Sequence, residues 1–227
     1  LTPDSLAAIL TGSSLGVTNV TYTGSTLARG AFSATATNLG FSSGIILSTG
    51  AIDSALGPNF SDSISMDLGE PGDADLTNSA NAQTNDAAVL EFDFIPEQDT
   101  VRFRYVFASD EYPEYVCSNF NDIFGFYISG PGITGVQNIA LIPGTTLPVV
   151  INSVNSGSTG SQGNPGPNCI LGYSNYYVDN TGGTSIQYDG FTTVLEAKSH
   201  VTPCQKYHMK IAVADAVDYA YDSAVFL

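Results

Sequence analysis

The amino-acid sequence predicts an all-β protein, an antiparallel β-sandwich with long loops and one short N-terminal helix. Two observations support this fold class. Apolar and polar residues alternate over short runs, which is the period of half-buried strands. Between these runs lie stretches rich in Gly, Pro, Asn, Asp and Ser, the residues that form turns. With 227 residues, of which 43% are hydrophobic, the chain can form one large β domain over residues 1–227.

The helix is expected at residues 5–10, where Leu6 and Leu10 would form an apolar face and Thr2 or Asp4 could cap the first turn. The strands are expected wherever the sequence alternates with period two or forms a short apolar run. They cover residues 18–23, 30–35, 44–48, 87–94, 100–107, 123–129, 183–188, 192–197, 207–214 and 223–227.

The two strongest strand patterns are neighbours in the chain. Residues 87–94 place Phe92 and Phe94 on one face, and residues 100–107 alternate in the same way. A short polar segment that begins at Pro96 separates them. We therefore expect these two strands to form a hairpin.

Two regions lack any strand or helix period, residues 49–86 and 155–176. Both are rich in Asn, Ser and Gly. Uninterrupted loops of more than about 12–15 residues in a compact domain are usually functional or disordered. The first region contains Asp73 and Asp75, whose side chains would point the same way in an extended segment.

The composition excludes several classes of partner. The chain has 22 acidic residues against 6 basic ones, a net charge of −16. Such a protein repels nucleic acid and anionic lipid surfaces, and it has no apolar run long enough for direct membrane insertion. Abundant Thr, Ser, Asn and Gly with little Lys is typical of secreted bacterial surface proteins, in which surplus acidic residues often bind cations.

An acidic loop follows the strand that ends near residue 107. It carries four carboxylates between residues 107 and 122, and three of them, Asp110, Glu111 and Asp122, lie beside strand ends. Carboxylate and amide oxygens are the ligands that Ca²⁺ prefers, so we predict a calcium site here. The alternative is a solvated loop in which Asp and Asn serve as turn residues.

A second acidic segment joins the last two strands and contains Asp215, Asp218 and Asp222. It lacks the EF-hand pattern, and a polar hairpin tip is the alternative interpretation. The carboxylates that we predict as Ca²⁺ ligands are Asp73, Asp75, Asp110, Glu111, Asp122, Asp215, Asp218 and Asp222. The side chains that we predict to contact a partner molecule are Tyr112, Glu114, Tyr115 and Asn121.

Three cysteines occur in the chain. Cys117 and Cys169 both lie in loops rich in Asn, Pro and Gly, where a disulfide can connect loops in an oxidising compartment. We favour this pairing over one with Cys204, although the sequence alone leaves open which cysteine is unpaired.

No catalytic motif is recognisable, so we do not expect an enzyme. The chain has no GxSxG motif, no phosphate-binding glycine loop and only two histidines. The remaining enzymatic alternative is a hydrolase that uses a carboxylate pair such as Glu111 and Glu114.

Several segments in a fixed order resemble the choice-of-anchor L domain family. The segments include DAAVLEFDF (86–94), VFASDEYPEY (106–115), FNDIFGF (120–126), QYDGFTTVL (187–195) and YDSAVFL (221–227). The resemblance extends over nearly the whole chain. It implies an ectodomain of a secreted bacterial surface protein, tied to the cell surface or part of a large adhesin, and it supplies no catalytic residues.

We therefore expect a calcium-stabilised extracellular binding module of a surface protein or adhesin, cut from a longer chain, that recognises a cell-surface glycan or peptide. The main alternative is a structural spacer domain without a soluble ligand. The carboxylate-pair hydrolase is a weaker alternative.

Overall fold

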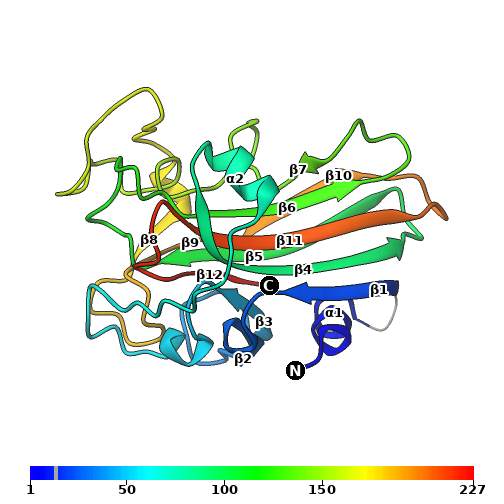
Figure 1. Ribbon diagram of the computed structural model, residues 1–227, viewed down its shortest axis with the longest axis horizontal. Helices are drawn as coiled ribbons and strands as arrows, with labels where there is room; N and C mark the ends of the chain where they lie inside the picture. Colours follow the sequence, from blue (N-terminus) through cyan, green and yellow to red (C-terminus); the bar gives the residue numbers. More distant parts are fainter. Residues whose placement is uncertain (13–14) are drawn as a thin grey trace.

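Two β-sheets pack face to face in the computed structural model, which describes residues 1–12 and 15–227 (Figure 1). The helices are α1 (Pro3–Thr11), α2 (Ala74–Ala80) and the 3-10 helices η1 (Thr26–Ala28), η2 (Ile52–Ala55) and η3 (Ser174–Tyr176). The strands are β1 (Gly16–Thr23), β2 (Arg29–Ser33), β3 (Ser43–Ser48), β4 (Thr84–Ile95), β5 (Thr100–Ser109), β6 (Ile123–Ser129), β7 (Gln137–Asn138), β8 (Tyr177–Asp179), β9 (Gly190–Thr192), β10 (Leu195–His200), β11 (Tyr207–Ala216) and β12 (Ser223–Phe226).

All paired strands run antiparallel, which confirms the predicted fold class. The first sheet has the order β1-β4-β11-β6-β7. The second has the order β2-β3-β12-β5-β9-β8, and β10 also pairs with β5. In Figure 1 the long strands run along the longest axis, and the long loops gather at the left end.

The core lies between the sheets and is rich in aromatic rings. Phe103 of β5 stacks on Phe126 of β6 with ring centroids 5.5 Å apart, and Tyr105 of β5 lies 4.8 Å from Phe124 of β6. Aromatic pairs at these distances add stability beyond the area that they bury. The alternation read from the sequence therefore identified the inward face of β5 correctly.

The predicted hairpin of residues 87–94 and 100–107 is wrong. β4 pairs with β1 and β11 in the first sheet, whereas β5 pairs with β9, β10 and β12 in the second. The chain thus crosses from one sheet to the other after Ile95. The rings of β5 pack against β6 of the first sheet, and Phe92 and Phe94 of β4 lie in the same core. Both apolar faces are therefore buried between the sheets without the two strands pairing.

The helical and loop predictions need three further corrections. The N-terminal helix is confirmed, and Thr2 caps it by accepting a hydrogen bond from the Ser5 amide at 3.2 Å. Residues 49–86 are not all loop, because they contain η2 and α2. Residues 183–188 form no strand and contribute only an isolated bridge between Ile186 and Leu56. The two short strands β7 and β8 were not predicted.

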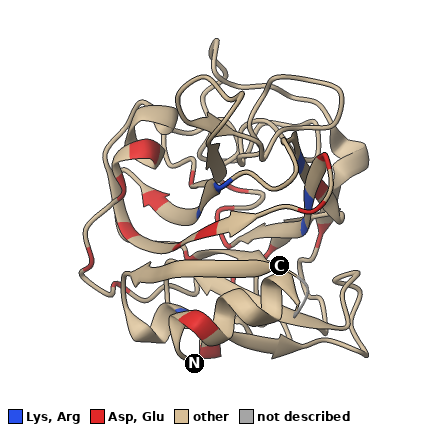
Figure 2. Cartoon of the chain, turned by 90° about the vertical axis from the view of Figure 1, so that its right-hand side faces the viewer, with Lys and Arg blue, Asp and Glu red and all other residues tan. Residues whose placement is uncertain are grey.

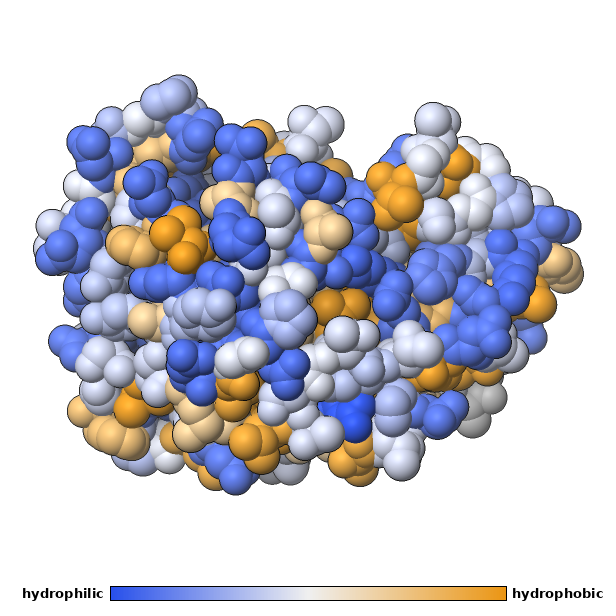
Figure 3. All heavy atoms as spheres, in the orientation of Figure 1, coloured by the Kyte–Doolittle hydropathy of each residue, from blue (hydrophilic) through white to orange (hydrophobic). Residues whose placement is uncertain are grey.

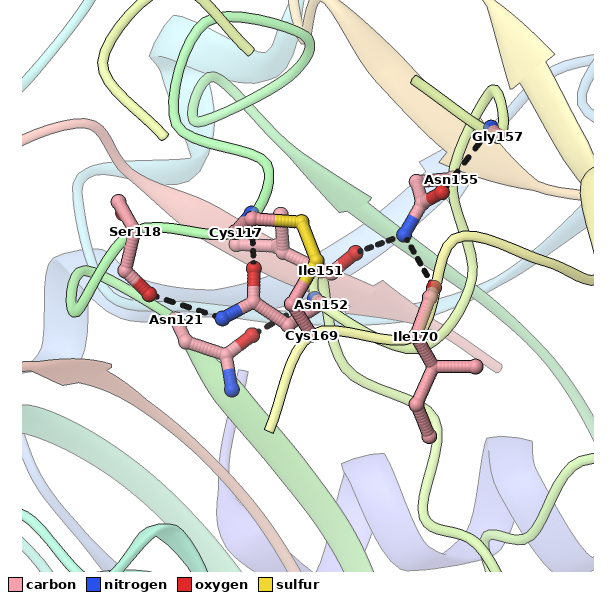
Figure 4. The surroundings of a disulfide bond; sticks show 9 residues. All are labelled: Cys117, Ser118, Asn121, Ile151, Asn152, Asn155, Gly157, Cys169 and Ile170. Carbon is pink, nitrogen blue, oxygen red and sulfur yellow. Dashed lines mark hydrogen bonds between the residues drawn. A yellow bond between two sulfur atoms is a disulfide. The ribbon is translucent and has the colours of Figure 1, made fainter. Parts of the chain in front are cut away.

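The disulfide joins Cys117 to Cys169, as predicted, and Cys204 is free and exposed. Two buried asparagines connect the same loops (Figure 4). Asn152 donates to the Ser118 carbonyl and accepts from the Cys117 amide, while Asn155 donates to the Ile151 and Ile170 carbonyls. The loop after β5 and the 155–176 insertion are thereby held together as one unit.

Removing the disulfide is expected to destabilise the protein. The bond closes a sequence separation of 52 residues, so its loss in a Cys117→Ser/Cys169→Ser variant is expected to cost about 2–4 kcal/mol of unfolding free energy. Urea unfolding measures this loss, and Cys204→Ser is the matched control that should leave the midpoint unchanged. An unaltered midpoint in the double variant would contradict the stabilising role.

Acidic residues dominate the charged groups, with few Lys and Arg among them (Figure 2). On the face shown in Figure 3, hydrophobic residues are scattered among polar ones and form no single large patch. None of the helices in the described part of the chain is long and apolar enough to cross a membrane.

Candidate metal centre

Strand pairing brings the two predicted acidic segments together at one end of the sandwich. β12 pairs with β5 so that Ser223 lies opposite Ser109, and β11 pairs with β6 so that Ala214 lies opposite Ile123. The residues just beyond these pairs therefore converge at the loop-rich end, at the left in Figure 1. We name this group the carboxylate cluster; its members are Asp110, Glu111, Asp122, Asp215 and Asp222.

All five side chains of the carboxylate cluster are buried, each with an exposed fraction of 2% or less. Among the described residues, no hydrogen-bond partner is found for either carboxylate oxygen of Asp110, Glu111 and Asp215, or for Oδ2 of Asp222. Buried polar atoms are almost always paired, and an unpaired buried charge is far more costly than an unpaired neutral group. The described residues therefore supply no partner for these buried carboxylate oxygens.

The other oxygens of the cluster are held firmly by the backbone and by a hydroxyl. Asp122 accepts from the Ala216 amide at 2.9 Å and from the Ser223 hydroxyl at 2.7 Å. Asp222 accepts from the Met66 amide at 2.9 Å. Its carboxylate also lies against Gly50, where an added Cβ would sit only 1.7 Å from Oδ2. These contacts fix the positions of two carboxylates while leaving the remaining oxygens free.

Burial and mutual repulsion raise the pKa values throughout the cluster. Burial raises the pKa of Asp110 to about 9, and nearby Asp189 and Asp222 add to this shift. Burial likewise raises the pKa of Asp222 to about 7, despite the Met66 amide, which lowers it. The pKa values of Glu111 and Asp215 are raised by burial first and by the charge of Asp122 second. Without a counter-ion, these groups hold protons well above their usual range.

The basic side chains of the described residues form no ion pair with the carboxylate cluster. Among the described residues, the ion pairs of Lys and Arg involve carboxylates outside the cluster. In the same part of the chain, no three His, Cys, Asp or Glu side chains form a ready-made metal centre. Binding a cation would therefore require these carboxylates to release their protons and to move closer together.

The oxygen-only donor set has the chemistry of a Ca²⁺ site. Calcium takes six to eight oxygen ligands in a flexible geometry, including carboxylates and backbone carbonyls. Zinc and copper prefer imidazole or thiolate ligands, and neither type occurs in the cluster. The residues present thus fit a hard divalent cation.

Two further acidic residues lie beside the cluster. Asp218, in the turn between β11 and β12, is half-buried and raises the pKa of Glu111 and Asp122. Asp189 is 1% exposed, accepts from the Asn59 amide and has one oxygen without a partner. Sequence reasoning missed Asp189. Its signal was its position directly before a strand, which Asp122 and Asp222 share.

The structure gives Asp73 and Asp75 a different partner. The Lys210 ammonium lies 2.5 Å from Asp73 and 2.7 Å from Asp75. Asp73 also caps α2, where it accepts from the Asp75 and Leu76 amides. Because Lys210 already supplies a cationic partner to both carboxylates, we correct their assignment and leave them out of the candidate cation site.

The four predicted ligand contacts lie in different environments. Tyr112 is fully buried, and its hydroxyl donates to the Val154 carbonyl at 2.6 Å, so its assignment as a ligand contact is corrected to a core residue. Tyr115 is half-buried against Tyr221, with ring centroids 4.8 Å apart. Glu114 is half-buried, and one of its oxygens has no partner among the described residues. Asn121 is half-buried and accepts a hydrogen bond from the Asn152 backbone amide at 2.8 Å.

The family model of the choice-of-anchor L domain matches residues 1–227. The chain belongs to the choice-of-anchor L domain family. No curated protein and no solved structure gives a significant match. The family match confirms the resemblance read from the sequence and indicates a surface or secreted domain of a bacterial protein. Together with the all-β fold of this choice-of-anchor L domain, it indicates a non-enzymatic module.

Proposed function

We propose that this choice-of-anchor L domain is a calcium-stabilised extracellular binding module of a bacterial surface protein or adhesin, with a cell-surface glycan or peptide as its ligand. The observation that carries the calcium role is the set of unpartnered oxygens on Asp110, Glu111 and Asp215, three buried carboxylates that form no ion pair with a basic side chain among the described residues. A divalent cation would neutralise these charges and occupy these oxygens, joining the loop after β5 to the turn between β11 and β12.

Calorimetry with EDTA and then with excess CaCl₂ tests the calcium role. A ligand that binds only the folded state at about 100 times its dissociation constant adds about 2.7 kcal/mol. For a domain of this size, that corresponds to a rise in Tm of about 5–10 °C. MgCl₂ is the control, because Mg²⁺ demands a strict octahedron and retains its water, so its effect should be smaller. A Tm that does not respond to calcium would rule out the role.

One observation favours a spacer role as the second candidate function. The carboxylate cluster is buried, so a cation bound there would rigidify the domain without contacting an external ligand directly. The spacer and the binding module therefore share the calcium prediction and differ only in whether a ligand binds elsewhere. The hydrolase alternative finds no support in the geometry, because Glu111 is fully buried and a polysaccharide could not reach it.

A further inference from the structure

A groove of about 720 Å³ lies beside the carboxylate cluster. Its walls are the C-terminal end of α2, the loop after β5, residues 147–153 and part of the 155–176 insertion, and Val217 completes it. Its volume lies within the range of about 300–1,000 Å³ that is usual for small-molecule sites. The groove is therefore large enough for a few linked sugar rings.

The lining of this groove contains no Asp, Glu, Lys, Arg or His. In a chain with 22 acidic residues, this uncharged lining stands out. Its polar groups are amide and hydroxyl side chains, among them Asn119, Asn121, Asn168 and Ser153. Amides and hydroxyls both donate and accept hydrogen bonds, which matches the hydroxyl groups of a sugar. Pro148 and other apolar residues supply surface for the C–H faces of the rings.

The wall formed by the loops is preorganised. Asn121 accepts from the Asn152 amide at 2.8 Å, and Asn152 in turn holds Ser118 and Cys117. Figure 4 shows that the side-chain nitrogen of Asn121 is directed away from this network, which leaves it free to donate to a ligand. A wall fixed before binding loses little entropy when a ligand arrives.

The groove and the carboxylate cluster share two loops. The loop after β5 carries Asp110 and Glu111 of the cluster and Asn121 of the groove. The turn between β11 and β12 carries Asp218 beside the cluster and Val217 in the groove. A cation that ordered these loops would therefore also shape two sides of the groove.

We propose that this groove is the ligand site and that it binds a neutral oligosaccharide. This inference rests on the proposed function, of which it names the site and the ligand class. An acidic sugar would meet the repulsion of a protein with a net charge of −16. A peptide recognised by main-chain pairing needs the edge of a sheet, whereas loops and the end of a helix form this groove.

Titration calorimetry of the full chain in CaCl₂ tests the site. The neutral probes are hexasaccharides of cellulose, starch, mannan and laminarin, and the acidic probe is an oligogalacturonate. At least one neutral hexasaccharide is expected to bind and the acidic probe is not. No binding by any neutral probe, or binding of the oligogalacturonate alone, overturns the inference.

Matched variants locate the binding. Asn119→Ala/Asn168→Ala removes two exposed amides of the lining and is expected to weaken binding at least about tenfold. Ala82→Trp would fill the groove and is expected to abolish binding. Asn164→Ala is the control, because Asn164 is exposed on the same insertion but lies outside the lining. Equal affinity in the groove variants and the control overturns the inference.

The calcium melting experiment on the same samples separates the two proposals. If calcium stabilises the domain but no neutral hexasaccharide binds, the calcium role is supported and the groove assignment is refuted. A domain that binds the sugar through the groove but does not respond to calcium supports the groove and refutes the calcium role.

Discussion

In EDTA, the domain is expected to become more stable as the pH falls from about 8 to about 5. The reason is the raised pKa of buried carboxylates. Burial raises the pKa of Asp222 to about 7, of Asp110 to about 9 and of Asp189 to about 6. In this range the folded chain holds protons that the unfolded chain releases, so the unfolding free energy decreases as the pH rises.

The direction of this pH dependence follows from the linkage between proton binding and folding. The stabilising contribution of each such group is complete below its unfolded pKa near 4 and is lost as the pH rises through its folded pKa. For Asp222 alone, the loss between about pH 5 and pH 7 amounts to roughly 2 kcal/mol. Asp93 behaves in the opposite way, because Lys206 and His208 lower its pKa. The contribution of Asp93 to stability is therefore lost only at pH values below its unfolded pKa near 4, outside the range from about pH 5 to pH 8.

Urea unfolding at several pH values in EDTA measures this slope, and the same series in CaCl₂ is the control. Calcium requires ionised carboxylates, so protons compete with it and the stabilisation by calcium should be larger at about pH 8 than at about pH 5. The two series should therefore converge at acidic pH. If the unfolding free energy of the metal-free domain instead increased between pH 5 and pH 8, the raised pKa values of the buried carboxylates would be contradicted.

Local sequence patterns predicted most strands because each depends on its own residues. The alternation of Phe92 and Phe94 is sufficient to define a buried strand face. The choice of sheet is not local: β4 and β5 belong to different sheets instead of pairing, and nothing in either strand specifies this. The helix α2 was missed because its seven residues span only two turns, and Asp73 as a capping residue was its one signal.

Part of the candidate site could also be predicted, because its acidic residues lie in segments that are recognisable from local sequence alone. Asp110, Glu111, Asp122, Asp215 and Asp222 lie beside strand ends in two acidic segments, and both segments were identified from the sequence. Their convergence depends on long-range pairing, which also explains why Asp189 was missed and why the Lys210 ion pairs with Asp73 and Asp75 were not foreseen. The burial of Tyr112 in a loop likewise has no local signature.

Asp215→Asn is expected to stabilise the metal-free domain and to remove most of its response to calcium. Asp215 is fully buried in β11, neither of its oxygens has a hydrogen-bond partner, and its pKa is raised by burial and by Asp122. Thr49 lowers this pKa but makes no well-formed hydrogen bond to the carboxylate. Asparagine has nearly the same shape and no charge, so the substitution removes the cost of burying or protonating this carboxylate without leaving a cavity.

The expected changes have opposite signs in the two conditions. In EDTA at about pH 8, the Tm of Asp215→Asn should lie above that of the unsubstituted domain, because asparagine is neutral without taking up a proton on folding, whereas the buried Asp215 must either be protonated or carry its charge beside Asp122. In CaCl₂ the increment of about 2.7 kcal/mol that calcium provides at 100-fold excess should largely disappear. Asp110→Asn, which removes a second carboxylate with two unpartnered oxygens, should behave in the same way.

Asp53→Asn is the matched control, because Asp53 is exposed on η2 and lies outside the cluster. It makes the same change in net charge, so any general effect of lowering the charge of −16 appears in it as well. If Asp215→Asn were instead destabilising in EDTA and retained the full calcium increment, the carboxylate would have a structural role unrelated to a cation. The opposite pattern, stabilisation without calcium and loss of the response with it, is what a site built from mutually repelling carboxylates requires, because only the bound ion makes their charge favourable.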